Sequence, residues 1–108
     1  MSCKIEVIPR FQKDVKRLKK KFPNIKRDLI KFVNEVETNP TMGTSLGKNI
    51  FKVRVPNSSI KSGKSGGFRV ITYYMKNDVL YLLTIYSKTE QDSILTQKLI
   101  EIVETEIK

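Results

Sequence analysis

Residues 64–92 read KSGGFRVITYYMKNDVLYLLTIYSKTEQD, and this stretch decides the fold. Two apolar runs flank Asn77-Asp78, a dipeptide that suits a tight turn, so the pattern predicts a β-hairpin. Gly66-Gly67 precedes the first strand and leaves the backbone free for strand entry or for close approach of a ligand. Arg69 lies between Phe68 and Val70 in this apolar strand. Core packing does not explain a cation at this position, and we infer that Arg69 binds an anion.

The part of the chain before residue 40 predicts one strand and two helices. Residues 4–8 alternate polar and apolar side chains, which indicates a short strand that stops at Pro9. Apolar residues then recur at helical spacing over 9–22 and again over 25–39. Pro23 separates the two stretches, so we expect an antiparallel helical hairpin.

The remaining segments complete an α+β pattern. Residues 41–47 are rich in turn formers, 49–55 alternate as a strand, and 56–67 form a polar loop long enough to be mobile or ordered by a ligand. A last helix should begin with Asp92 or Ser93 as its cap. The predicted order is β-α-α-β-β-β-α, a mainly antiparallel sheet flanked by helices in a single domain that spans residues 1–108.

The charge of the chain points to polyanionic partners. It carries 21 Lys and Arg against 11 Asp and Glu, a formal net charge of +10. Such an excess attracts nucleic acid, the ribosome or an acidic protein, and the alternative is a solvated basic surface. No apolar run approaches the roughly 20 residues that cross a bilayer, and the N-terminus lacks the pattern of a signal peptide. We therefore expect a cytoplasmic protein with no membrane partner.

The lack of His and the single Cys limit the catalytic and metal-binding chemistry open to the chain. The chain contains no His, the usual general base near neutral pH and the commonest metal ligand. Its single Cys, Cys3, indicates a buried or edge thiol rather than a nucleophile. We expect no metal and no cofactor, so any catalysis would use Lys, Arg, Tyr and carboxylates.

The register of the hairpin predicts which side chains meet. Counting outward from a two-residue turn at 77–78 pairs Met75 with Leu80, Tyr73 with Leu82, Ile71 with Thr84 and Arg69 with Tyr86. Lys88 follows Tyr86 by two residues and should share its face. A guanidinium, a phenol and an ammonium would thus converge at one end of the sheet.

More cations can reach this end. The loop that carries Lys61 and Lys64 leads directly into it. Lys52 and Arg54 join the same face if the strand over 49–55 pairs beside the strand of Arg69. Elsewhere, the run Lys19-Lys20-Lys21 is typical of a solvated helix end, which can also contact phosphates without sequence specificity.

Such a cluster suits a phosphodiester. Clustered cations repel one another in the empty protein, and an anion completes the group. Arginines can hold the non-bridging oxygens and stabilise charge at phosphorus. A lysine crowded by cations has a lowered pKa and can take the proton of an RNA 2′-OH, while Tyr86 or another cation assists the leaving oxygen. The alternative is a set of surface cations, with Tyr86 as an aromatic residue at the edge of the core.

The chain resembles the RelE/ParE superfamily of bacterial toxins in its order of elements and in three stretches. These are Phe51-Lys-Val-Arg-Val55, Gly66-Gly-Phe-Arg69 and Ile85-Tyr-Ser-Lys-Thr-Glu-Gln-Asp92. The KSGGFRVITYY pattern and the YSKTEQD ending look most like the HigB-type branch. The resemblance covers nearly the whole chain.

The resemblance implies a RelE-like microfold, a cognate antitoxin, and metal-independent cleavage of mRNA in the ribosomal A site. It implies that Lys52 and Arg54 line the site, together with Arg69 and Lys88. RelE itself has a further arginine after the last cation and a tyrosine in the final helix, where this chain has Thr89 and Leu95. The proton carriers therefore cannot be transferred.

Together, these arguments predict a set of site residues. The expected catalytic residues are Arg69, Lys88, Arg54, Lys64 and Tyr86. The expected contacts to RNA phosphate or rRNA are Lys52, Lys61, Lys19 and Lys20.

The residues leave two other functions open. A ParE-like toxin would inhibit DNA gyrase by binding, and the same fold supports either activity. A non-catalytic basic module would bind RNA or ribosomes without cutting. The cation-rich end of the sheet favours the ribosome-dependent endoribonuclease, an mRNA interferase that inhibits translation.

Overall fold

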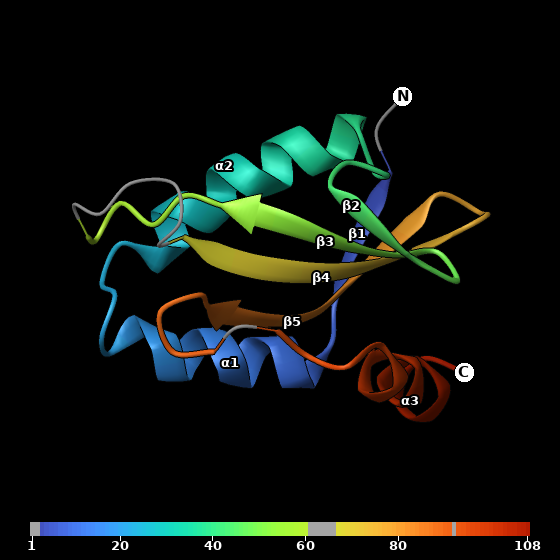
Figure 1. Ribbon diagram of the computed structural model, residues 1–108. Coiled ribbons are helices and arrows are strands. Elements are labelled where there is room, and N and C mark those ends of the chain that lie inside the picture. The colour runs from blue at the N-terminus through green and yellow to red at the C-terminus, as the bar shows by residue number, and fades with distance from the viewer. Residues whose placement is uncertain (1–2, 61–66, 92) are drawn as a thin grey trace.

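The computed structural model describes residues 3–60, 67–91 and 93–108 (Figure 1). In chain order its elements are β1 (Lys4–Val7), α1 (Pro9–Lys19), α2 (Ile25–Thr38), β2 (Thr44–Gly47), β3 (Ile50–Val55), β4 (Phe68–Met75), β5 (Val79–Ser87) and α3 (Thr96–Glu106). The strands form one five-stranded sheet in the order β1-β5-β4-β3-β2. β1 runs parallel to β5, and the other neighbours are antiparallel. The α+β prediction is confirmed.

The helices cover the sheet from different sides. α1 packs along β5, α2 contacts β1 and β3, and α3 contacts β5 near the C-terminus (Figure 1). Phe22, just after α1, meets the ring of Phe68 edge to face at a centroid distance of 5.5 Å. β4 is the third of the five strands, and its residues from Phe68 to Tyr73 are all buried. None of the described helices is both long enough and apolar enough to cross a membrane.

The segment over 41–47 differs from the prediction. It contains a strand, β2, which pairs antiparallel with β3 and adds one strand to the predicted order. β2 has only four residues and is largely exposed at the edge of the sheet, so it has no alternating pattern to reveal it. Gly47, Lys48 and Asn49 then adopt positive φ angles and turn the chain tightly into β3.

The hairpin of β4 and β5 has a three-residue turn, not the predicted two-residue turn. Asp78 takes a φ of 61°, and its N–H donates to the Met75 carbonyl at 3.2 Å. The predicted partners of Met75 and Tyr73 are therefore wrong by one residue: they pair with Val79 and Tyr81.

A β-bulge then restores the predicted register further along the hairpin. Leu83 is the extra residue between the pairs Thr72–Leu82 and Ile71–Thr84. Beyond the bulge, the pairs Ile71–Thr84 and Arg69–Tyr86 are as predicted.

The first part of the loop after β3 is anchored to the helices. The Ser58 N–H donates to the buried Asp28 carboxylate at 3.0 Å, and the Asn24 N–H donates to Ser59 Oγ at 2.9 Å. The Asn57 side chain closes a local turn by accepting the Ser59 N–H at 2.9 Å. Residues 57–60 are thus tied to α2 and to the connection that precedes it, whereas 61–66 lie outside the described residues.

The last helix begins later than predicted. α3 starts at Thr96, its N-cap is Leu95, and no side chain caps it. Leu95 is 79% exposed, so it does not belong to the apolar face of the helix. Of the two predicted caps, Ser93 precedes the helix by three residues, and Asp92 lies outside the described residues.

Candidate functional site

A row of three polar side chains crosses the three central strands near one end of the sheet. Arg54 on β3 lies directly opposite Arg69 on β4, and Arg69 lies directly opposite Tyr86 on β5. Directly opposed residues on antiparallel strands have Cβ atoms about 4.5–5.5 Å apart. The row therefore places two guanidinium groups side by side with a phenol next to them, as the sequence predicted.

The row borders an open cleft of about 520 Å³. The residues that line the cleft are Gly43, Thr44, Lys52, Arg54, Arg69 and Lys88. Lys52 precedes Arg54 by two residues on β3 and therefore points to the same face of the sheet. Four cations, from the neighbouring strands β3 and β4 and from the turn after β5, thus meet around one space.

Arg69 is the most desolvated cation of the four. Its residue is 6% exposed, whereas Arg54 is exposed and Lys52 and Lys88 are half-buried. Its Nη1 donates to the Phe68 carbonyl at 3.2 Å. Burial and the neighbouring Arg54 charge lower the pKa of Arg69, and Tyr86 opposes this change. A guanidinium held in such surroundings interacts strongly with an incoming anion.

Close backbone contacts fix the position of these side chains. A Cβ at Gly67 would lie 2.6 Å from the Val55 carbonyl oxygen, so only glycine allows β3 and the start of β4 to approach this closely. The Gly67 carbonyl in turn accepts the Lys88 N–H at 3.1 Å. Gly43 has a φ of +96°, and a Cβ there would lie 2.5 Å from the Lys52 carbonyl oxygen.

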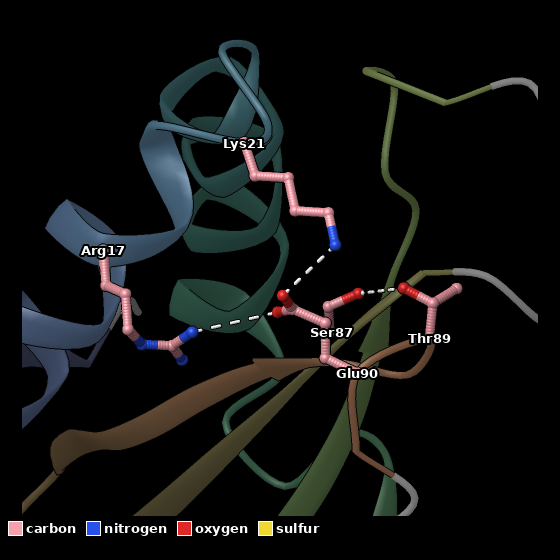
Figure 2. Close-up of polar contacts among 5 residues, drawn as sticks. All are labelled: Arg17, Lys21, Ser87, Thr89 and Glu90. Atoms are coloured by element: carbon pink, nitrogen blue, oxygen red, sulfur yellow. Dashed lines mark hydrogen bonds and ion pairs between the residues drawn. The ribbon is translucent and has the colours of Figure 1, made fainter.

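The turn that carries Lys88 is held by α1. The Ser87 carbonyl accepts the N–H groups of both Glu90 and Gln91 at 3.0 Å, which closes the turn. The Glu90 carboxylate reaches back to α1, where it lies 3.8 Å from Arg17 Nη1 and, just beyond the helix, 3.3 Å from Lys21 Nζ (Figure 2). The Ser87 and Thr89 hydroxyls are 2.9 Å apart within the same turn.

The structure brings together some of the predicted site residues and separates others. Lys52, Arg54, Arg69 and Lys88 line the cleft, as predicted. Tyr86 is 3% exposed and does not line it, so its place is beside Arg69 within the sheet. Lys19 and Lys20 lie away from the cleft, at the end of α1. Lys61 and Lys64 are outside the described residues.

Sequence reasoning missed two residues of the cleft wall, Gly43 and Thr44. They belong to β2 and the turn before it, a segment that showed no strand pattern. A glycine at position 43 next to a threonine was the available signal, because a glycine often marks a close backbone approach.

The cleft has the chemistry of an anion site. Arg54 and Arg69 can each offer planar pairs of N–H donors, and Lys52 and Lys88 add point charges around them. Such donors match the non-bridging oxygens of a phosphodiester. Within the described residues, no three His, Cys, Asp or Glu side chains gather as a metal site would require.

Comparisons with known proteins agree with this geometry. The profile of the family described as "RelE toxin of RelE / RelB toxin-antitoxin system" matches residues 10–105. A solved structure of E. coli toxin RelE in the free state, with two arginines mutated to alanine, is 16% identical and has a TM-score of 0.64. The match covers 96% of this chain and 97% of that chain. Comparison with curated protein sequences gives no significant match. The chain therefore belongs to the RelE toxin family, within the RelE/ParE superfamily of toxins from toxin–antitoxin systems.

Proposed function

We propose that this toxin is a ribosome-dependent endoribonuclease that cleaves translated mRNA in the A site and so inhibits translation. The observation that carries the proposal is the buried Arg69, which stands between Arg54 and Tyr86 at the wall of the cationic cleft. Residues 1–108 would act as one domain. The KSGGFRVITYY pattern and the YSKTEQD stretch over 86–92 resemble the HigB-type branch, and we propose that the toxin belongs to it.

The energetics of the row support a functional role. Like charges directly opposite each other on neighbouring strands destabilise a sheet, and Arg54 and Arg69 are such a pair. Desolvation of the Arg69 guanidinium adds to this penalty. This arrangement lowers the stability of the fold when no ligand is bound. Binding of an anion would offset the cost, because the anion removes the repulsion and completes the hydrogen bonds.

The proposed reaction is a transesterification within the RNA. The 2′-oxygen attacks the adjacent phosphorus, the bond to the 5′-oxygen of the next nucleotide breaks, and a 2′,3′-cyclic phosphate and a 5′-hydroxyl form. The proton of the 2′-hydroxyl is balanced by the proton that the leaving 5′-oxygen gains. Negative charge increases on the phosphoryl oxygens in the transition state, and Arg54 and Arg69 are placed to stabilise it.

The other cations would hold the substrate. Lys52 and Lys88 lie on opposite sides of the row and are proposed to hold the phosphates that flank the scissile one. Lys61 and Lys64 remain proposals for the same role, because their segment lies outside the described residues. Tyr86 is proposed to set the position of Arg69 and to influence the leaving oxygen through it. Lys19 and Lys20 would contact rRNA away from the cleft.

The proposed partners follow from the family and from the charge. RelE-type toxins pair with an antitoxin, so we expect a cognate antitoxin that neutralises this chain. The net charge of +10 favours association with the ribosome, the densest source of RNA phosphate in a translating cell. Binding to rRNA would present translated mRNA to the cleft.

Controlled expression in bacteria tests the proposal. We expect the wild-type chain to stop protein synthesis and deplete mRNA, while Arg69→Ala and the bulkier Arg69→Met permit growth. Circular dichroism and co-purification with the antitoxin establish that both variants fold. Full growth inhibition by folded Arg69→Met would contradict the proposal. A DNA-damage response that precedes the loss of protein synthesis would instead indicate a gyrase poison.

A further inference from the structure

A second row of cross-strand side chains lies beside the row that contains Arg69. Thr44 on β2 is directly opposite Lys52 on β3, and Lys52 is directly opposite Ile71 on β4. Directly opposed residues share one face of a sheet, so Thr44 points to the face that carries Lys52 and Arg54. Ile71 is buried, so the part of this row that opens to the cleft consists of Lys52 and Thr44.

Thr44 differs in chemistry from the other residues that line the cleft. Apart from Thr44 and a glycine, the described residues of the lining are all cations. Thr44 is exposed, and no other described group hydrogen-bonds to its hydroxyl. Two other hydroxyls of the sheet are already engaged: Ser45 Oγ accepts the Gly47 N–H at 3.2 Å, and Thr84 Oγ1 donates to Asp14 at 2.5 Å. The Thr44 hydroxyl is therefore the uncharged group of the cleft that is open to a ligand.

The backbone around Thr44 fixes the position of its hydroxyl. Gly43 has a φ of +96°, and a Cβ there would lie 2.5 Å from the Lys52 carbonyl oxygen, so the chain packs tightly against β3 just before Thr44. The pairing of β2 with β3 then shifts register between Ser45 and Gly47. Irregularities of this kind are common beside active sites, where they set the direction of a side chain. A group held from both sides selects a ligand by geometry and does not adapt to it.

The distance from Arg54 to Thr44 suits a neighbouring nucleotide. Thr44 lies one strand beyond Arg54 and two residues further along the sheet. With strands about 4.8 Å apart and about 3.4 Å per residue, the two backbone positions are roughly 8 Å apart. A phosphate bound by Arg54 and Arg69 leaves this space for the sugar and base of an adjacent nucleotide, whose own phosphate Lys52 would hold. The base then lies at the wall formed by Thr44.

We propose that Thr44 is a specificity-determining residue that reads the base next to the scissile phosphate and favours guanine. The inference rests on the proposed function, because the cleft is taken to hold mRNA. Contacts to phosphate position a nucleic acid, whereas contacts to base edges carry the sequence information. The cations of the cleft suit the first role, and the uncharged Thr44 hydroxyl suits the second.

The preference for guanine follows from the surroundings of the hydroxyl. A hydroxyl hydrogen rotates to suit its neighbours, and the ammonium of Lys52 attracts the oxygen lone pairs of Thr44. The hydrogen therefore points away from Lys52 and is donated to the ligand. Guanine presents two adjacent acceptors, O6 and N7, whereas adenine has an N6 donor in place of O6. Pyrimidines lack the ring that carries N7 and extend less far from the sugar.

Binding of short RNA analogues tests the inference without ribosomes or cleavage. The probes are two 2′-O-methyl hexanucleotides, which lack the attacking 2′-hydroxyl: one contains only adenosine, and the other has guanosine at its third position. Fluorescence anisotropy with the full chain gives an affinity for each probe. The wild type should bind the guanosine probe about three- to ten-fold more tightly, the factor that one hydrogen bond contributes.

Three variants assign the preference to the hydroxyl. Thr44→Val keeps the shape of the side chain and removes the hydroxyl, so the ratio of the two affinities should fall to about one. Thr44→Ser retains the hydroxyl and should retain most of the preference. Thr41→Val makes the same substitution at an exposed position outside the cleft lining and should leave the ratio as in the wild type. Circular dichroism establishes that the variants fold.

The results separate base readout by Thr44 from the nuclease activity. Equal affinities of the wild type for the two probes, or no binding of either, would overturn the readout even if the wild type cleaves mRNA. A preference that survives in Thr44→Val would overturn it, and so would an equal loss for both probes, which would make Thr44 a phosphate contact. A preference lost in Thr44→Val and kept in Thr41→Val, in a wild type that leaves translated mRNA intact, would uphold the readout and contradict the nuclease.

Discussion

Replacing Arg54 with glutamine should stabilise the fold and weaken the activity at the same time. Arg54 and Arg69 are directly opposed on β3 and β4, so their charges repel in the empty protein. Two unit charges about 6 Å apart repel by about 0.7 kcal/mol in water, and by about 1.4 kcal/mol at an effective dielectric constant of about 40. Taking the lower value for the exposed Arg54, Arg54→Gln should raise the melting temperature by about 3–6 °C in a domain of this size.

The same change removes a group that we place next to the reacting phosphate. Loss of one donor to the charge of a transition state typically slows a reaction about 100-fold or more. We therefore expect mRNA cleavage by Arg54→Gln to fall by about 100-fold in a reconstituted translation reaction. Differential scanning fluorimetry of the same preparation measures the melting temperature, so both effects come from one sample.

Two control variants isolate the cause. Arg54→Lys keeps the charge and should leave the melting temperature near that of the wild type, although it loses the planar pair of donors. Lys98→Gln on α3 lowers the net charge equally, at an exposed position outside the cleft lining. If Arg54→Gln is no more stable than Lys98→Gln, the Arg54–Arg69 repulsion does not lower the stability of the fold. If Arg54→Gln cleaves mRNA like the wild type, Arg54 does not stabilise the transition state. Either result contradicts the prediction.

Three further substitutions test contacts that stabilise the fold. Gly67→Ala should lower the free energy of unfolding by about 1–3 kcal/mol, because its Cβ would meet the Val55 carbonyl oxygen; an unchanged urea midpoint would contradict the close approach. Thr84→Val should cost about 1–2 kcal/mol by leaving the Asp14 carboxylate without its donor, and urea unfolding equal to the wild type would refute this. Burial raises the pKa of the Cys3 thiol, so the thiolate favours the unfolded chain. Stability from Cys3 should be complete below its unfolded pKa of about 8.5 and decline as the pH rises through the folded value. Cys3→Ala should flatten this decline, and identical pH profiles would exclude it.

The predicted meeting of Arg69 and Tyr86 was right, but for an incomplete reason. The sequence predicted a two-residue turn, and the structure has three residues there, which shifts the pairs next to the turn. The bulge at Leu83 adds one residue to β5 and corrects the register before Arg69 is reached. A bulge inside an apolar strand leaves no mark in the hydrophobic pattern, since Leu83 is buried like its neighbours. Its position could not be derived from periodicity.

Lys52 and Arg54 could be predicted as cleft residues because their strand alternates clearly, whereas the contribution of β2 to the cleft could not be predicted. Lys52 and Arg54 share one face of β3, and this follows from the two-residue period of a strand. β2 is short and exposed, so its contribution to the cleft depends on a long-range pairing that local propensity does not encode. The approach of Glu90 to α1 is also a tertiary contact, between residues far apart in the chain. The sequence alone indicated only a helix start near Glu90.

The most direct test of the central claim is a reconstituted bacterial translation reaction with a defined mRNA, with cleavage ends mapped by primer extension. Wild-type protein and Arg69→Ala are compared, each with and without ribosomes. The account predicts codon-spaced cuts that require both the ribosome and Arg69. Intact mRNA with folded wild-type protein, or equal cleavage by Arg69→Ala, would contradict it.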